Sequence, residues 1–184
     1  MTQATEDTLR KIEQSARRRY LPIIGREKGR LLGKIVAEHK PRRVLEVGTL
    51  VGYSTIQMGK ILGGDAEIVT IEVDRDEAEV VRENIRASEI RSRVTVVTGD
   101  AQDVIPTLAG TIDMVFLDAA KNQYLAYLRL VEDRLEAGAV VVADNAGFSS
   151  RAMRDYLEYV RGSGRYSSQY IPVGWDGIEI SVKQ

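Results

Sequence analysis

The order of apolar segments predicts an α/β fold, a doubly wound Rossmann-like sheet of seven strands. Short apolar runs alternate with helical patterns, which is typical of a parallel sheet covered by helices on both faces. The runs at 113–118 and 139–144 are nearly continuous, as expected of strands with no solvent-facing side. No helical pattern separates the last two runs. We therefore expect a mostly parallel sheet with one antiparallel strand near the C-terminus.

The predicted helices follow from periodicity and from residues that end helices. Residues 5–19 are polar and finish in three arginines, which suit the negative end of a helix. Apolar residues recur at helical spacing in 29–39, and Pro22 and Pro41 mark the breaks on either side. The later helices are predicted at 54–62, 75–88, 102–108, 124–134 and 150–160.

The predicted strands are short apolar runs rich in β-branched residues. They lie at 43–48, 67–73, 93–99, 112–118, 139–144, 167–173 and 178–182. The pattern contains no internal repeat and no second-domain boundary. We therefore expect a single domain over 1–184, with residues 1–22 as an N-terminal helical lid segment.

The composition is that of an ordinary soluble protein, and it excludes several chemistries. Hydrophobic residues make up 43% of the chain and charged residues 29%. The absence of cysteine excludes disulfides, thiolate metal sites and cysteine nucleophiles. No apolar run approaches the roughly 20 residues that span a bilayer, and the polar start does not resemble a signal peptide. We expect a cytoplasmic protein with no membrane partner.

Charge is distributed unevenly along the chain. Residues 1–43 contain 12 Lys and Arg against 5 Asp and Glu, whereas the remainder contains 14 against 22. A basic segment can meet an anionic partner such as RNA, or it can form a solvated helix face.

The segment 44–54, "VLEVGTLVGYS", has the character of a cofactor-binding turn. Gly48 and Gly52 let the backbone turn tightly and approach a ligand, and the following helix directs free N–H groups at it. The spacing differs from the Gly-x-Gly-x-x-Gly of dinucleotide enzymes. Glu46 suits an ammonium, while Ser54 and the helix N-terminus suit a carboxylate. S-adenosylmethionine carries both groups.

A second acid follows at the end of the next predicted strand. Glu72 lies about 20 residues after the turn, where a carboxylate can accept hydrogen bonds from both ribose hydroxyls. Asp74 faces the same way but is better placed to cap the following helix. The alternative is that both acids are helix caps.

Several segments taken together resemble one known family. They are "GREKGRLLGKIVAEHKPRRVLEVGTLVGYS", "VTIEV", "GDAQDVIPTL", "IDMVFLDAAKNQY", "VVVADN" and "DGIEI". In this order they resemble the class I S-adenosylmethionine-dependent methyltransferases, and within these the metal-dependent catechol and caffeoyl-CoA O-methyltransferases. The likeness extends from about residue 24 to 182.

Two predicted strand ends carry oxygen ligands. Asp118 ends one strand, and Asp144 and Asn145 end the next. Ligands of open α/β sheets bind outside this edge, and two carboxylates with an amide oxygen suit a hard cation. We expect Mg²⁺, with Ca²⁺ or Mn²⁺ as alternatives.

The resemblance implies roles for further residues. Lys121 matches the lysine that takes the proton from the acceptor hydroxyl. Ile24, with Gly25, matches the segment over the amino acid end of the cofactor. Ala101 and Gln102 match the adenine-binding turn, and Asp118 would contact both metal and cofactor.

The sequence departs from the catechol enzymes around the acceptor. Ala119 and Ala120 replace bulky aromatic residues, and Tyr170 lies near the place of a glutamate that contacts the second hydroxyl. The N-terminal lid is short. The slot is therefore expected to be more open, or completed by another subunit in a homodimer.

The resemblance implies an S-adenosylmethionine- and metal-dependent O-methyltransferase acting on a catechol-like or vicinal-diol small molecule. The alternatives are a tRNA methyltransferase acting on a wobble-base hydroxyl, and a binding protein that has lost catalysis. A complete set of Asp118, Lys121, Asp144 and Asn145 argues against the last, because a pure binder needs no base.

Overall fold

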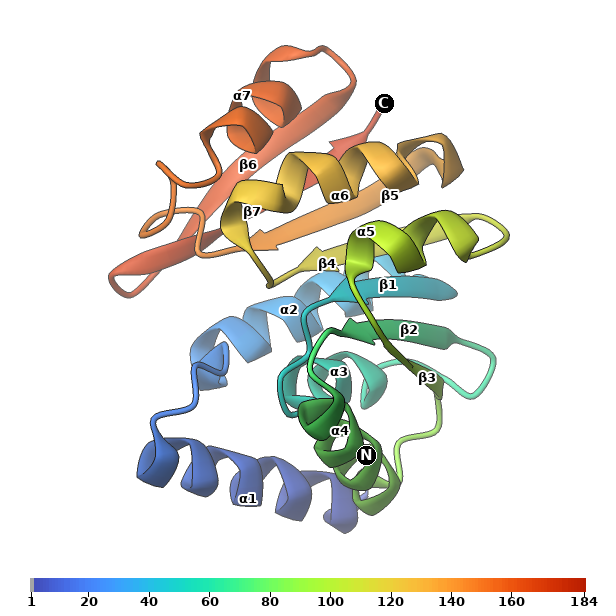
Figure 1. Cartoon of the computed structure of the whole chain (residues 1–184), viewed down its shortest axis with the longest axis vertical. Helices are drawn as coiled ribbons and strands as arrows, with labels where there is room; N and C mark the ends of the chain where they lie inside the picture. The colour runs from blue at the N-terminus through green and yellow to red at the C-terminus, as the bar shows by residue number, and fades with distance from the viewer. Residues whose placement is uncertain (1) are drawn as a thin grey trace.

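A single mixed sheet of seven strands organises residues 2–184, which the computed structural model describes; residue 1 of the predicted N-terminal segment lies outside this range. The strand order is β3-β2-β1-β4-β5-β7-β6 (Figure 1). The strands are β1 Arg43–Val47, β2 Glu67–Glu72, β3 Arg93–Thr98, β4 Ile112–Leu117, β5 Leu135–Asp144, β6 Tyr166–Val173 and β7 Asp176–Lys183.

Parallel pairing brings several strand ends to one edge of the sheet. Strands β1 to β5 are all parallel, whereas β7 runs antiparallel to both β5 and β6. The prediction of one antiparallel strand near the C-terminus is therefore confirmed. In register, Val47 lies beside Ile71 and Leu117, and Leu117 lies beside Ala143. The residues that follow these positions consequently meet at the carboxyl edge.

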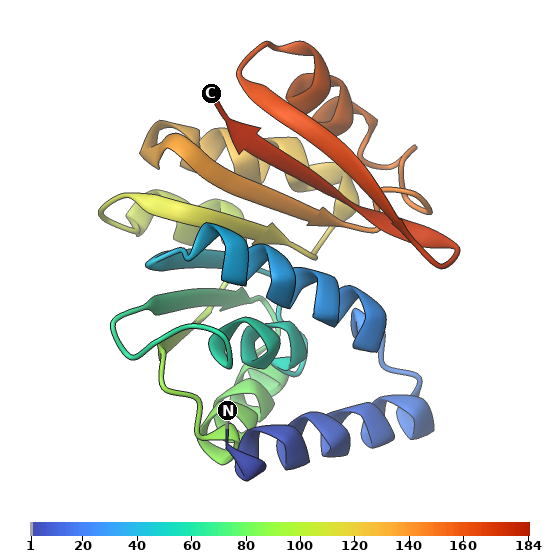
Figure 2. The same cartoon turned by 180° about the vertical axis from the view of Figure 1, so that it is seen from behind.

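Helices cover both faces of the sheet. They are α1 Gln3–Arg19, α2 Gly25–His39, α3 Tyr53–Gly59, α4 Arg75–Ser88, α5 Ala101–Val104, α6 Tyr124–Val131 and α7 Arg154–Gly162, with 3₁₀ turns η1 Ile105–Thr107, η2 Lys121–Gln123 and η3 Glu132–Arg134. Helices α5, α6 and α7 lie on the face seen in Figure 1, and α2 and α3 lie on the face seen in Figure 2.

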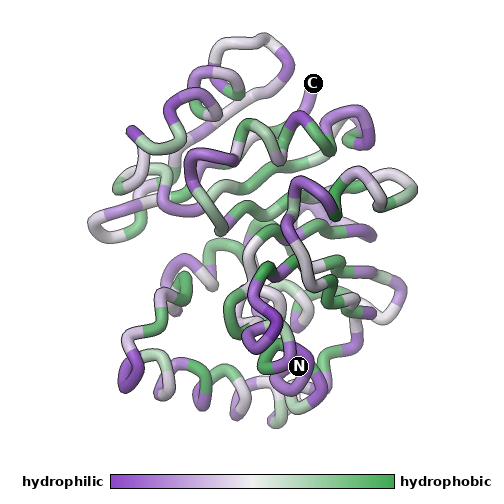
Figure 3. The backbone as a smooth tube through the Cα atoms, viewed as in Figure 1, coloured by the Kyte–Doolittle hydropathy of each residue, from purple (hydrophilic) through white to green (hydrophobic). Residues whose placement is uncertain are grey.

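Alternation along the central strands builds a hydrophobic core on each face. Within β4, Val115 and Leu117 pack with the α6 and α7 residues, while Met114 and Phe116 pack with α2 and α3. Figure 3 shows the hydrophobic residues concentrated in the strands and on one side of α1. Leu9 of α1 belongs to a third cluster with α3, which docks α1 beside α3 and α4.

The element boundaries differ from expectation in two informative places. Strand β5 begins at Leu135, although the apolar run begins at residue 139, because Leu135 already pairs with Ile112 of β4; a register shift separates this pair from that of Val140 with Met114. Helix α7 begins at Arg154 instead of near residue 150, because a turn follows β5, in which the N–H of Ser149 donates to the carbonyl oxygen of Asn145 at 2.8 Å.

In residues 2–184, no helix combines the length and hydrophobicity that crossing a bilayer requires.

Candidate active site

A cavity of about 490 Å³ opens at the carboxyl edge of the sheet. Its wall comprises the turn after β1, the end of β2, the start of α5, the loops after β4 and β5, and the 22–24 segment that leads into α2. This is the position at which open α/β sheets bind ligands.

The glycine turn forms one side of this cavity. Gly48 has a φ of 84°, in the left-handed region, and a Cβ atom there would lie 2.4 Å from the carbonyl oxygen of Asp118. Gly52 has a φ of 81° and immediately precedes α3. Both positions therefore need glycine, and at Gly48 the requirement arises from close approach to the loop that carries Asp118.

Glu46 lies behind the cavity wall and is fully buried. Its carboxylate accepts hydrogen bonds from the hydroxyls of Ser54 and Thr55, and Ser54 itself lines the cavity. Burial raises the pKa of Glu46 to about 7, against the opposing effect of the hydroxyl donors. In this structure Glu46 positions Ser54, and direct contact between Glu46 and a cofactor ammonium stays a prediction.

Glu72 lines the cavity and also holds the glycine turn in place. Its Oε2 accepts the N–H groups of Thr49 at 3.2 Å and Leu50 at 2.8 Å. The Oδ1 atom of Asp74 accepts two N–H groups of α4, at 2.8 and 2.9 Å, which confirms Asp74 as the helix cap. Glu72 is thus free of the capping role, and its contact with a ribose stays a prediction.

Of the residues predicted to contact the adenine and to cover the amino acid end of the cofactor, some line the cavity and one is on the surface. Ile24 and Ala101 line the cavity. Gln102 is exposed and lies outside the wall; its N–H donates to Asp100, which does line the cavity. Tyr127 of α6 is a wall residue that sequence reasoning missed. An aromatic residue on a helix next to the adenine turn is the signal that could have indicated it.

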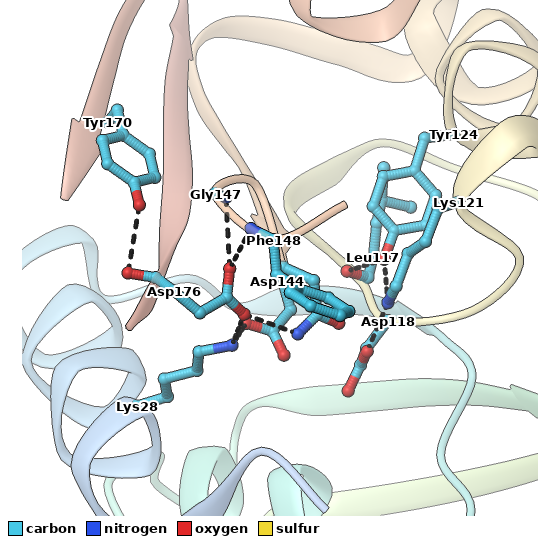
Figure 4. Close-up of polar contacts among 11 residues, drawn as sticks. Lys28, Leu117, Asp118, Lys121, Tyr124, Asp144, Gly147, Phe148, Tyr170 and Asp176 are labelled. Carbon is cyan, nitrogen blue, oxygen red and sulfur yellow. Dashed lines mark hydrogen bonds and ion pairs between the residues drawn. The ribbon is translucent and has the colours of Figure 1, made fainter. Parts of the chain in front are cut away.

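Lys121 lines the cavity and is held by two oxygen atoms. Its Nζ lies 2.8 Å from Asp118 Oδ1 and 2.8 Å from the hydroxyl oxygen of Tyr124, as Figure 4 shows. The Tyr124 hydroxyl donates to the carbonyl oxygen of Leu117 at 2.9 Å. Burial, followed by the charge of Asp118, raises the pKa of Tyr124 well above its ordinary value, so Tyr124 is a neutral anchor for the lysine.

The three predicted metal ligands meet at the ends of β4 and β5. Asp118 and Asn145 line the cavity, and Asp144 is 2% exposed. Burial, followed by the charge of Asp118, raises the pKa of Asp144, as expected when two carboxylates lie close together. Two crowded carboxylates and an amide oxygen fit a hard cation. No group of three or more His, Cys, Asp and Glu side chains suited to a metal occurs in residues 2–184.

Two charged residues behind this edge were missed by sequence reasoning. The Nζ of Lys28, on α2, lies 2.6 Å from Asp144 Oδ1 and 2.6 Å from Asp176 Oδ2. Asp176, at the start of β7, also accepts a hydrogen bond from Asn145 Nδ2 at 2.7 Å. The signals were a lysine between the two glycines of "GREKG" and the acid of the "WDG" turn.

The fold and the cavity together define a class of protein. A sheet with one antiparallel strand near the C-terminus, a glycine turn after β1 and an acid at the end of β2 are the features of the Rossmann-like, S-adenosylmethionine-dependent methyltransferases. The O-methyltransferase family model matches residues 2–158. The chain therefore belongs to the O-methyltransferase family and is of the catechol O-methyltransferase type.

Known relatives agree with this assignment. Catechol O-methyltransferase of Sus scrofa is 37% identical over 172 residues, which cover 86% of this chain and 91% of that protein. The O-methyltransferase TomG from Streptomyces achromogenes, solved with S-adenosylmethionine, has a TM-score of 0.86 at 28% identity and matches 100% of this chain and 90% of that one. The O-methyltransferase from Bacillus cereus, solved with S-adenosylhomocysteine, has a TM-score of 0.86 at 28% identity, covering 96% and 91%.

Proposed function

We propose that this O-methyltransferase moves the methyl group of S-adenosylmethionine to one hydroxyl of a catechol-like phenol or vicinal diol, with a divalent cation bound beside the acceptor. One observation carries the proposal. The same cavity is lined by the glycine turn and Glu72 and also by Asp118, Lys121 and Asn145.

The cofactor end of the cavity is preformed. Glu72 fixes the backbone of the turn through Thr49 and Leu50, so the free N–H groups at the start of α3 have a defined direction. Ser54, held by buried Glu46, offers a hydroxyl near that helix end. These groups would bind and orient the amino acid and ribose portions of the cofactor, whose sulfonium supplies the methyl group.

The acceptor end supplies ligands for a cation. Asp118, Asp144 and Asn145 would hold Mg²⁺ or a similar ion, which lowers the pKa of a hydroxyl group that it coordinates. Lys121 is then the proton acceptor. Its Nζ, held by Asp118 and Tyr124, is a cavity wall group, and a positioned amine can take the proton of a reacting hydroxyl. Holding the acceptor oxygen in line with the methyl group would supply much of the rate gain.

The acceptor slot is wide for a small phenol. Ala119 and Ala120 line the cavity next to Lys121, and neither side chain narrows it as an aromatic residue would. Phe148 and Trp175 are 72% and 79% exposed beyond Asn145, with ring centroids 5.1 Å apart. This arrangement favours planar acceptors that vary in their substituents.

An acceptor panel tests the proposal. Purified enzyme with labelled S-adenosylmethionine and Mg²⁺ is given catechol, a catechol with a bulky ring substituent, phenol, and an aliphatic vicinal diol. Transfer to the oxygen of the two catechols, with little transfer to phenol, is the expected result. Methyl transfer to none of the hydroxyl acceptors would contradict it.

A second candidate is methylation of a hydroxyl on a tRNA wobble base. The observation that favours it is the end of α1, where Arg17, Arg18 and Arg19 are exposed and the adjacent Tyr20 is 91% exposed. Basic side chains beside an exposed aromatic ring suit a single-stranded nucleic acid. Unmodified tRNA in the same assay decides between the two, because label incorporated into tRNA, but not into the catechols, would replace the small-molecule proposal.

A further inference from the structure

A buried polar cluster lies directly behind the proposed cation ligands. Lys28, Asp144 and Asp176 are 8%, 2% and 4% exposed and come from α2, the end of β5 and the start of β7. Figure 4 shows the Lys28 ammonium between the carboxylates of Asp144 and Asp176. Charges this deeply buried are costly unless they are paired, so a lysine shared by two acids indicates a defined task.

Asp176 uses both of its carboxylate oxygens. Oδ1 accepts the N–H groups of Gly147 at 3.2 Å and Phe148 at 2.8 Å, which fixes the loop after β5. Oδ2 accepts Lys28 Nζ at 2.6 Å and Asn145 Nδ2 at 2.7 Å. One carboxylate therefore joins α2, the loop after β5 and the β6–β7 hairpin.

This arrangement determines which end of the Asn145 amide faces the cavity. An ionised carboxylate can only accept hydrogen bonds, so the group that meets Asp176 must be the NH₂ of Asn145. The amide oxygen is at the other end and accepts no hydrogen bond within residues 2–184. Asn145 has a φ of 62°, and the residue lines the cavity. The oxygen is the atom that a hard cation requires.

We infer that Lys28 and Asp176 are positioning residues for the cation: Lys28 places the carboxylate of Asp144, and Asp176 turns the amide oxygen of Asn145 toward the cation. The inference rests on the cation site of the proposed function. Neither residue coordinates the ion or contacts the acceptor, and both act through the ligands that they hold.

The substitution Asp176→Asn tests the orientation directly. The new amide has nearly the same shape, but one of its two ends is an NH₂ group. In either orientation that NH₂ meets donors, which are Lys28 and Asn145 on one side and the N–H groups of the loop on the other. Loss of such an outer partner typically weakens metal binding by about 10–100-fold.

The control is a buried acid on the same strand that lies away from the cavity. Glu179 of β7 is 0% exposed and pairs with Arg161 of α7 at 2.6 Å. Glu179→Gln removes a buried carboxylate from an ion pair, as Asp176→Asn does, so it reports the general cost of disturbing β7. We expect it to lower the free energy of unfolding and to leave the metal affinity unchanged.

A second variant exchanges the two side chains. In Asn145→Asp with Asp176→Asn, the carboxylate at 145 can accept the NH₂ of residue 176, so this hydrogen bond returns with its polarity reversed and the total charge is kept. Lys28 loses its bond to residue 176 and keeps its pairing with Asp144. An oxygen still faces the cation. This double variant should recover most of the metal affinity that Asp176→Asn loses. If Asp176→Asn does not fold, the metal affinity of the double variant tests the positioning role of Asp176.

Mn²⁺ binding is measured without an acceptor, by electron paramagnetic resonance of the free ion. The parent and the variants are all saturated with S-adenosylmethionine. The inference expects a loss of about 10–100-fold in Asp176→Asn, none in Glu179→Gln, and an affinity within about tenfold of the parent in the double variant. Parent-like affinity in Asp176→Asn, or a folded double variant as weak as Asp176→Asn, overturns the positioning role. A parent that binds no Mn²⁺ overturns the proposed cation site itself.

Discussion

The substitution Gly48→Ala should destabilise the protein and disturb both ends of the site, because of where its Cβ atom would lie. That atom would lie 2.4 Å from the carbonyl oxygen and 2.8 Å from the carbonyl carbon of Asp118. Both are backbone atoms, and they are held because the N–H of Asp118 donates to the carbonyl oxygen of Val47 at 2.9 Å. The loop that carries Asp118 must therefore move.

The magnitude has two sources. An alanine at a φ of 84° costs about 1–2 kcal/mol. Forcing extra volume into a packed site costs a further 1–3 kcal/mol, roughly, so the free energy of unfolding should fall by about 2–5 kcal/mol. Because the displaced loop bears Asp118, cofactor affinity and metal affinity should fall together.

Two glycines provide matched controls. Gly138 has a φ of 89°, and among the described residues no atom lies within 4 Å of its added Cβ, so Gly138→Ala measures the backbone strain alone. Gly162, at the end of α7, has equally open surroundings among those residues and no left-handed φ, and its alanine variant should be close to neutral. Urea unfolding and calorimetry with S-adenosylmethionine give the two readouts. A Gly48→Ala protein as stable as Gly138→Ala, with parent-like cofactor affinity, would refute the close approach to Asp118.

Three further predictions address single side chains. Glu72→Ala should weaken S-adenosylmethionine binding by about 1–3 kcal/mol in calorimetry, because the buried ribose hydroxyls of the cofactor would lose their acceptor. Unchanged affinity would limit Glu72 to holding Thr49 and Leu50. Lys121→Met should lower turnover at neutral pH by about 10²–10⁴-fold, with less loss at alkaline pH, while cofactor affinity is kept; parent-like turnover with chemistry limiting would remove the base assignment. Burial raises the pKa of Glu46 from 4.5 to about 7, so the folded state keeps a proton that the unfolded chain has released, and the free energy of unfolding should fall as pH rises through this window. The change is about 3 kcal/mol at 1.36 kcal/mol per unit, and urea unfolding of Glu46→Gln should lack it.

The sequence predicted the order of elements well because hydrophobic patterning carries that information. Seven apolar runs correspond to the seven strands found in residues 2–184, and the missing helix between the last two runs correctly indicated the antiparallel β7. The boundaries were harder. Residues 136–138 of β5 are exposed and form no apolar run, so the pairing of Leu135 with Ile112, and not hydropathy, identifies residues 135–138 as strand.

The site residues that lie at the end of a strand, or in the turn directly after it, could be predicted from the sequence. Gly48 and Asp118 each follow a strand end and Glu72 is the last residue of β2, and the parallel register brings them together. Lys28 and Asp176 were not predictable in this way. They are 148 residues apart in the chain, and a lysine on a polar helix is ordinarily exposed.

Two side-chain environments also depended on tertiary structure. Tyr124 has the spacing of a core residue on α6, and its sequence position does not reveal that its hydroxyl reaches Lys121. The contact of Glu46 with a cofactor ammonium stays a prediction, and its hydrogen bonds with the hydroxyls of Ser54 and Thr55 could not be predicted from the sequence.

Metal dependence of methyl transfer to catechol tests the central claim most directly. The parent enzyme, stripped of metal by a chelator and dialysed, is assayed with S-adenosylmethionine and catechol, with and without added Mg²⁺, while cofactor binding is measured in the same samples. We predict that transfer to the catechol oxygen is lost on chelation and restored by Mg²⁺, and that S-adenosylmethionine binds in both states. Full transfer after chelation would contradict the role given to Asp118, Asp144 and Asn145.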